Sequence, residues 1–388
     1  MIRKIVFLII MVIFLVGCEK QPSVQSPIKI GAILELTGNI PLLGASAKNA
    51  AVMAVKEVND KGGLTFQNKK IPIELIMEDN DATGNGPIIA ANKLIYQDKV
   101  LAIVGPDTSS RTILAAPIAE KAKIPLITPS STFSDVTTDP ITGKYRKYVF
   151  RACFDNAFEV KTLVNFARYT KNYKTAAILY ESTSANSVDQ ANFFRYNFEK
   201  LGGKIVAFES YKDTNKDFIT QLQIIKAANP DVLFLPDFYS SVALIAMQVK
   251  ALDIRSELLG SDNWNRPKLS SESMAALEGA YFASHYSPDA HSEVTQNFVK
   301  SYQKLYNQIP DDVAALTYDA YQILFKAISA SKNLTSTDVR NSLIDLPVME
   351  GVTGTISFEE DFGGNPNKSA VIVQVKNGQF VWVTYANP

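Results

Sequence analysis

The chain contains 388 residues, of which 46% are hydrophobic, and its 39 basic side chains balance its 39 acidic ones. A chain without a basic surplus is poorly suited to bind nucleic acid or an anionic lipid surface, so we expect neither as a partner. Its length favours two domains over one.

The first residues have the pattern of an export signal. The basic residues Arg3 and Lys4 stand near the start of the chain, and residues 5–16 then contain no polar side chain. That apolar run is too short to cross a bilayer, which takes about 20 residues. The run ends in "LVGC", which resembles the bacterial lipobox. We therefore predict a signal peptide over residues 1–17 and a lipidated Cys18, with a buried N-terminal strand as the alternative.

The resemblance to a lipobox implies at least two acyl chains on Cys18, enough to hold a protein firmly to a membrane. Residues 18–27 are rich in Gln, Ser and Pro, which predicts a flexible linker. We expect an exported protein, anchored to the cell membrane or the outer membrane and facing the periplasm or the cell exterior. Cys153 is then the only other cysteine, which excludes a disulfide within the chain and favours a buried apolar role.

Apolar strands alternate with amphipathic helices through the first part of the chain. The strands are continuous runs of Ile, Val and Leu, typical of parallel strands covered on both faces. The pattern stops where Ser, Thr, Asp, Pro and Gly crowd together, at residues 130–147. We predict strands at residues 29–34, 71–77, 100–104 and 124–128, and helices at residues 45–59, 87–96 and 109–121.

The same alternation then resumes, which predicts an α/β fold with two similar Rossmann-like lobes on parallel central sheets. Helices are expected at residues 156–169, 188–201, 217–228 and 241–252, and strands at residues 174–180, 204–208 and 231–235. A mostly helical part follows at residues 292–307, 312–331 and 336–346, and short strands close the chain at residues 355–358, 369–375 and 380–383.

Motifs of the common enzyme classes are missing from the sequence. It has no Gly-x-Ser-x-Gly elbow, no phosphate loop and no paired-cysteine motif. His285 and His291 lie six residues apart in a polar segment, so they do not share a helix face. We expect both histidines to be solvated and not bound to metal. The prediction is a protein that is not an enzyme and uses neither a metal nor a cofactor.

Three segments place hydroxyl groups or a carboxylate directly after predicted strands, where open α/β sheets bind ligands. The first leads into a helix at Ser109, and a helix N-terminus attracts anions. The second covers residues 130–132, and the third delivers Asp262 beside a tryptophan. Helix capping or a plain turn would explain each segment alone. Together they offer an anion site facing an isolated carboxylate, which are the two groups that a zwitterion needs.

Longer stretches resemble the type 1 periplasmic solute-binding proteins, specifically the leucine/isoleucine/valine-binding group that serves ABC transporters. The likeness covers nearly all of the chain after the linker and includes "KIGAILELTGNIPLLG", "GPDTSSRT", "IPLITPSST" and "LLGSDNW". It implies a hinge of three crossovers, which we place near residues 150–151, 283–284 and 354–356. The implied lobes are an N-terminal one of residues 28–150 plus 284–355 and a C-terminal one of residues 151–283 plus 356–388.

The resemblance also implies roles for particular residues. Ser109 would bind the ligand carboxylate, Ser130 would contact it through the main chain, and Thr132 would lie at the ligand's polar head. Asp262 falls where the family places an acidic residue against the α-ammonium group, a glutamate in the leucine-binding members. Four further positions would contact the rest of the ligand: Leu43, Asn186, Phe238 and Tyr239.

We therefore predict a monomeric, extracytoplasmic binding protein of an ABC importer that captures a branched-chain or related amino acid and delivers it to a membrane permease. Leu43 and Asn186 stand where the family usually has aromatic residues, so the pocket should be roomier or differently polar. A ligand-binding sensor would use the same fold, and an amide or an aromatic acid is the alternative ligand.

Overall fold

The computed structural model describes residues 26–38, 40–80, 84–265 and 270–387. The predicted signal peptide, Cys18 and most of the predicted linker lie outside these described residues. No helix in the described part of the chain is both long and apolar enough to cross a membrane.

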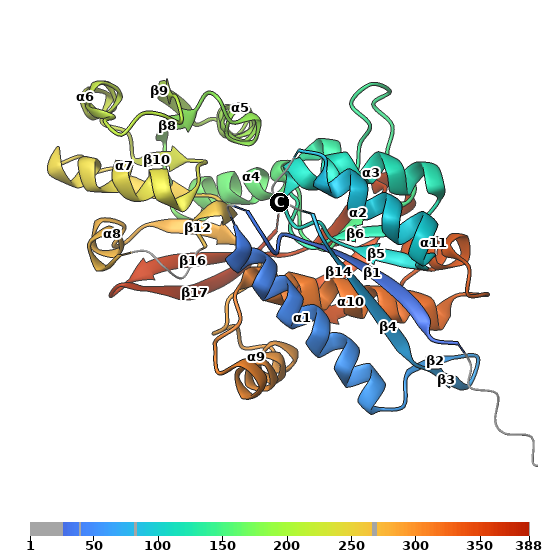
Figure 1. Ribbon diagram of the computed structural model, residues 1–388. Coiled ribbons are helices and arrows are strands. Elements are labelled where there is room, and N and C mark those ends of the chain that lie inside the picture. Colours follow the sequence, from blue (N-terminus) through green and yellow to red (C-terminus); the bar gives the residue numbers. More distant parts are fainter. Residues whose placement is uncertain (1–25, 39, 81–83, 266–269, 388) are drawn as a thin grey trace, which may run out of the picture.

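The first lobe is built on a five-stranded parallel sheet (Figure 1), in the strand order β4-β1-β5-β6-β7. Because all five strands point the same way, their carboxyl ends share one edge of the sheet. The strands are β1 (Ile28–Leu34), β4 (Ile73–Asp79), β5 (Ala102–Val104), β6 (Leu126–Thr128) and β7 (Val149–Arg151).

Helices cover both faces of this sheet, which explains why its strands are apolar on both sides. One face, around Ile30 and Phe150, carries α1 (Pro41–Asp60), α10 (Asp312–Ala330) and α11 (Ser336–Ile344). The other face, around Ile103, carries α2 (Gly86–Asn92) and α3 (Ser109–Ala122). α9 (Glu293–Tyr306) packs on α1 and α10.

The second lobe is built on a seven-stranded sheet in the order β17-β16-β12-β11-β10-β8-β9. The strands β8 to β12 are parallel, whereas β16 and β17 join them in antiparallel fashion. They are β8 (Thr175–Glu181), β9 (Lys204–Tyr211), β10 (Val232–Leu235), β11 (Glu257–Gly260), β12 (Tyr281–Ser284), β16 (Ala370–Lys376) and β17 (Gln379–Ala386).

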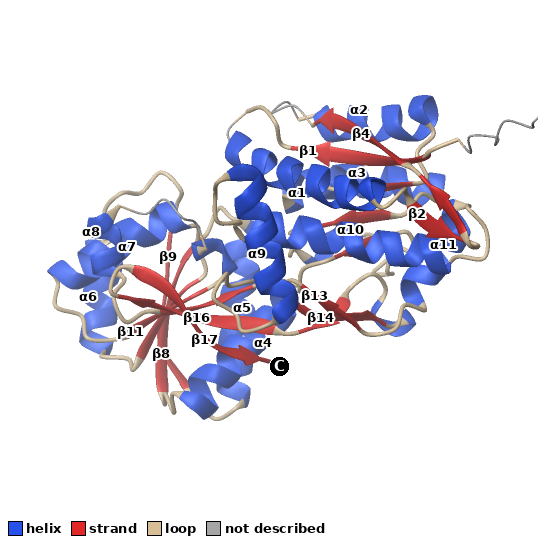
Figure 2. Ribbon diagram, turned by 90° about the horizontal axis from the view of Figure 1, so that it is seen from below, coloured by secondary structure: helices blue, strands red, loops and turns tan. Residues whose placement is uncertain are grey.

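Helices cover this second sheet as well. α4 (Asn156–Asn165) and α5 (Ala185–Lys200) pack on one face, where the rings of Phe194 and Phe234 stack 4.3 Å apart. α6 (Ile219–Ala228), α7 (Tyr239–Ala251) and α8 (Ser271–Ala276) pack on the other face. Figure 2 shows the two lobes side by side. The predicted α/β fold with two helix-covered sheets is confirmed.

Smaller elements complete the fold. β2 (Leu64–Phe66) and β3 (Lys69–Ile71) form a hairpin, and β13 (Met349–Gly351), β14 (Gly354–Phe358) and β15 (Pro366–Lys368) form an antiparallel sheet. Two π-helical turns continue α2 and α4, and three short 3₁₀ helices lie in loops: η1 (Lys93–Asp98), η3 (Phe166–Thr170), η2 (Ser134–Val136), η4 (Asp262–Trp264) and η5 (Glu360–Phe362).

Within the described residues the chain passes between the lobes in three places. β7 leads into α4, β12 leads into α9, and β15 leads into β16 at Ser369. The third passage comes later than the predicted residues 354–356. The reason is that these residues belong to β14, which pairs with β13 and β15, and its Ile356 and Phe358 pack in the core of the first lobe.

A buried ionic cluster lies just before the third passage. Asp319 of α10 accepts hydrogen bonds from the amides of Val352 and Thr353, each at 2.8 Å, and from the Thr353 hydroxyl. Lys368 donates to the carbonyl and hydroxyl oxygens of Thr353. Burial lowers the pKa of Lys368 to about 8, against the opposing effect of the Asp319 charge. The cluster fastens the end of β15 to α10.

Gly44, in the first turn of α1, should tolerate no larger residue. A Cβ atom there would lie 2.1 Å from the carbonyl oxygen of Glu35, just after β1. Because that contact is with backbone, the helix itself would have to move, and we expect Gly44→Ala to lower the free energy of unfolding by about 2 kcal/mol.

Gly84→Ala is the matched control for this variant, because nothing lies within 4 Å of a Cβ atom added at Gly84. Urea unfolding followed by circular dichroism measures both variants. Equal unfolding midpoints for the two would contradict the tight packing of α1 against the end of β1.

Candidate functional site

The predicted hydroxyl segments meet at the carboxyl edge of the first sheet. β5 and β6 are neighbours there; Ser109 begins α3 after β5, while Ser130 and Thr132 follow β6. The Ser109 hydroxyl accepts a hydrogen bond from the amide of Phe133 at 3.3 Å, and the Ser130 hydroxyl donates to the carbonyl of Asp107 at 2.9 Å. Two loops from different parts of the sequence therefore form one polar surface.

The N-terminus of α3 is suited to bind an anion. Thr108 is the N-cap residue, but its side chain makes no capping hydrogen bond, and Ser109 is already the first helical residue. Within the described part of the chain, the amides of Ser109 and Ser110 donate to no acceptor. Such amides carry the positive end of the helix dipole, which favours a carboxylate.

Two buried carboxyl groups lie behind this surface, and sequence reasoning missed both. Glu35 and Asp107 are each 1% exposed. One carboxylate oxygen of Glu35 accepts hydrogen bonds from the amides of Asp107, at 3.2 Å, and Thr108, at 3.1 Å. Burial and the nearby Glu35 charge raise the pKa of Asp107 well above its ordinary value, and burial also raises that of Glu35. Two carboxyl groups so placed favour sharing a proton.

Asp262 lies in η4, directly after β11, and is 9% exposed. Its amide donates to Glu159 of α4 at 2.6 Å, and its Oδ2 lies 3.0 Å from Nε2 of His285. His285 is 1% exposed, with its ring centroid 3.7 Å from that of Phe154. The prediction that His285 is solvated is therefore wrong, because this residue lies where two passages between the lobes pack together. His291 is exposed, as predicted.

A chain of hydrogen bonds links the loops of the two lobes. The carbonyl of Thr132 accepts from the amide of Asn156 at 3.1 Å, and the Asn156 side chain donates to Oδ1 of Asn186 at 2.8 Å. Gln190 donates to Asn156 at 3.4 Å and to Glu159 at 2.9 Å. Since Glu159 also accepts from the amide of Asp262, the network brings three predicted site residues from both lobes together.

The remaining residues that are predicted to contact the ligand lie near the carboxyl edges of the two sheets, outside the hydrogen-bonded network described above. Leu43 is partly buried in α1 and packs on a small apolar cluster around Leu34 and Val313. Phe238 follows β10, the neighbour of β11, and is 50% exposed, while Tyr239 is partly buried at the start of α7. A contact between these side chains and a ligand remains a prediction.

The described residues include no group of three or more metal-ligating side chains. Cys153 is buried, as predicted, and burial raises the pKa of its thiol to about 12. A thiol of this kind stays protonated at neutral pH and is a poor nucleophile.

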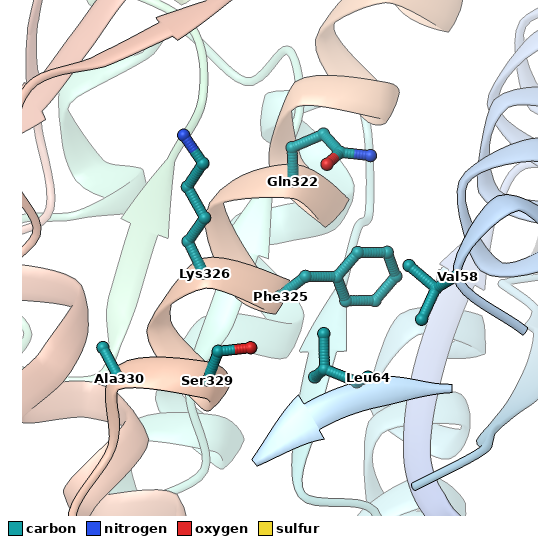
Figure 3. Close-up of a pocket in the computed structure, with 7 residues that line it drawn as sticks. All are labelled: Val58, Leu64, Gln322, Phe325, Lys326, Ser329 and Ala330. Atoms are coloured by element: carbon teal, nitrogen blue, oxygen red, sulfur yellow. The ribbon is translucent and has the colours of Figure 1, made fainter. Parts of the chain in front are cut away.

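A surface groove of about 470 Å³ lies elsewhere on the first lobe (Figure 3), between α1, β2 and α10. Its lining is mainly apolar, and the ring of Phe325 points toward Val58. Because α1 starts at the carboxyl edge of the sheet and Val58 is close to its other end, this groove lies away from Ser109. No acidic residue lines it, so it lacks a partner for an ammonium group.

Two α/β lobes whose polar site residues follow the carboxyl ends of parallel strands define the type 1 periplasmic binding protein fold. Residues 27–379 match the family described as periplasmic binding protein, and the chain belongs to that family. The resemblance inferred from the sequence motifs is thus confirmed.

Several relatives are similar over almost their whole length. The crystal structure of the leucine-binding protein LivK from Thermotoga maritima is 31% identical, covers 93% of this chain and 99% of its own, and superposes with a TM-score of 0.80. The branched-chain amino acid binding protein LivJ from Streptococcus pneumoniae, in complex with isoleucine, is 29% identical, with coverage of 94% and 100% and a TM-score of 0.78. The Leu/Ile/Val-binding protein homolog 7 from Brucella abortus is 24% identical over 374 residues, 92% of each chain.

Asp237, at the end of β10, should make stability depend on pH. It is 3% exposed, and burial raises its pKa to about 6. The folded protein therefore binds a proton that the unfolded chain releases between about pH 4 and pH 6, so stability falls as the pH rises through this range. We expect Asp237→Asn to gain up to about 3 kcal/mol over the parent chain at pH 7.5 and to lose this advantage near pH 4.

Thermal unfolding of both proteins at several pH values measures this difference. Asp213→Asn, at an exposed aspartate, controls for the loss of one charge. A difference in melting temperature between Asp237→Asn and the parent chain that stays constant from pH 4 to pH 7.5 would show that Asp237 titrates normally.

Proposed function

We propose that this protein is the exported, lipid-anchored binding protein of an ABC importer, and that it captures an amino acid between its lobes for delivery to a membrane permease. The export pattern that ends at Cys18 supports the anchor. Two similar proteins, one described as leucine-binding and one in complex with isoleucine, support the amino acid. A tether would keep the loaded protein near its permease at a high effective concentration.

The proposal rests on two groups of opposite polarity, one in each lobe: the start of α3 and the carboxylate of Asp262 in η4. The Ser109 hydroxyl and the amides at the start of α3 would take the α-carboxylate. Asp262 would take the α-ammonium group, and its Oδ1 is buried with no hydrogen-bond partner among the described residues. An unpartnered buried carboxylate oxygen is costly, so a bound ammonium group would relieve that cost.

The interaction energies expected at this site are large enough for micromolar affinity. Each charge-assisted hydrogen bond contributes about 1.5–3 kcal/mol, and burial of an aliphatic side chain contributes a similar amount. Micromolar binding needs only about 8 kcal/mol in all. Two or three bonds at each end of a zwitterion are therefore enough once the costs of association are subtracted.

Closure of the lobes would complete the site. A ligand that touches both α3 and η4 stabilises the arrangement in which these elements are close. Phe238, half-exposed at the edge of the second lobe, would lose solvent contact on closure. Asn186 would contribute a polar side chain beside the ligand, with its Oδ1 held by the Asn156 amide.

A thermal-shift screen of the twenty L-amino acids, small amides and aromatic acids tests the proposed ligand class. We expect at least one L-amino acid to raise the melting temperature, since a ligand at 100 times its Kd stabilises a protein by about 2.7 kcal/mol. If amides or aromatic acids raise the melting temperature and no amino acid does, the proposed amino acid ligand is wrong. The assignment of the binding-protein fold would not depend on that result.

Asp262→Ala should weaken amino acid binding much more than Phe238→Ala does. Loss of a charge-assisted hydrogen bond predicts a Kd that is higher by about 10- to 100-fold for Asp262→Ala, whereas a half-exposed ring contributes only a few-fold. Isothermal titration calorimetry with the amino acid that gives the largest shift in the screen measures both. An unchanged Kd for Asp262→Ala would exclude Asp262 as the ammonium ligand.

A further inference from the structure

His285 is the buried partner of the Asp262 carboxylate. Its Nε2 lies 3.0 Å from Oδ2, and the histidine is 1% exposed against 9% for the aspartate. The other carboxylate oxygen, Oδ1, is buried and accepts no hydrogen bond within the described part of the chain. The histidine therefore occupies one oxygen of this carboxylate and leaves the other for a further donor.

The backbone of η4 is held separately from the carboxylate. The amide of Asp262 donates to Glu159 at 2.6 Å, and the indole nitrogen of Trp264 donates to the carbonyl of Leu235 at 3.1 Å. These two bonds fix η4 against α4 and the end of β10. They do not fix rotation of the Asp262 side chain, for which His285 is the polar partner that the structure shows.

The passages between the lobes hold the His285 ring in place. His285 directly follows β12, in the second passage, and Phe154 lies in the first passage, between β7 and α4. Their ring centroids are 3.7 Å apart, and Phe154 in turn stacks on Phe158 of α4 at 5.8 Å. The orientation of the Asp262 carboxylate is thereby tied to the segments that connect the lobes.

We infer that His285 is a positioning residue for ammonium recognition: it holds Oδ2 of Asp262 so that Oδ1 is oriented for the α-ammonium group of the ligand. This inference rests on the proposed function, because it takes Asp262 as the ammonium ligand. A donor that fixes one oxygen removes the rotational freedom of the carboxylate, which would otherwise have to be lost on binding. The same bond satisfies a carboxylate oxygen that would be costly to bury alone.

Two substitutions separate the effect of the His285 nitrogen donor from the effect of the His285 ring. His285→Phe keeps a ring against Phe154 and removes the donor, whereas His285→Gln keeps a donor and removes the ring. We expect the Kd for L-leucine, or for the L-amino acid that gives the largest shift in the screen, to rise by about tenfold in His285→Phe and to stay within about threefold of the parent value in His285→Gln. Calorimetry gives the Kd, and melting temperatures show that each variant is folded.

A double-mutant cycle with Asp262→Asn distinguishes positioning from general support of the fold. If His285 acts through Asp262, His285→Phe should change the Kd by no more than about twofold in the Asp262→Asn background. Similarly, 4-methylpentanoate, which is leucine without its amino group, should bind the parent chain and His285→Phe equally.

An equal loss from His285→Phe in both backgrounds would overturn the inference, as would a tenfold loss in a fully folded His285→Gln. The second result decides the matter even if His285→Phe does not fold. Absence of binding of every L-amino acid to the parent chain would instead contradict the proposed function, so the two failures are distinguishable.

Discussion

The buried carboxyl group of Glu159 organises the junction between the lobes through the hydrogen bonds that it accepts. One of its oxygens accepts from the amide of Asp262, and the other accepts from Gln190, which also donates to Asn156. A buried carboxyl group without donors is costly, so these groups are held where Glu159 can reach them. Burial and the charge of Asp262 raise the pKa of Glu159 well above its ordinary value, which limits the negative charge beside Asp262.

The three passages between the lobes are fixed in different ways, and this restricts how the lobes can move. The first two are joined by the contact between the rings of Phe154 and His285. The third starts from Lys368, which is fastened through Thr353 to Asp319 on α10. A closing motion of the kind proposed would have to keep these contacts or break them, so they limit which residues of the passages could act as a hinge.

Local patterns in the sequence were enough to predict the sheets and the first-lobe hydroxyls, but not the groups that become buried through tertiary contacts. The positions of Ser109, Ser130 and Asp262 at the sheet edges are predictable because these residues follow apolar runs, and the ends of parallel strands meet at one edge. The sequence does not indicate the burial of His285, because its neighbours in the sequence are polar, whereas its neighbours in space are Phe154 and Asp262.

The same limit applies to the pairing of strands into sheets. The strand that contains Ile356 was expected, but a short strand does not indicate which sheet it joins, and the third passage was therefore placed too early. Both lobes are in fact discontinuous: the first needs α10 and β14, and in the second β16 pairs with β12 although residues 285–369 lie between them in the chain. Because β16 comes late in the sequence, one edge of β12 has no partner until the last part of the chain has been synthesised. A chain that ended before β16 would leave that edge of β12 unpaired, which favours pairing with the edges of other chains.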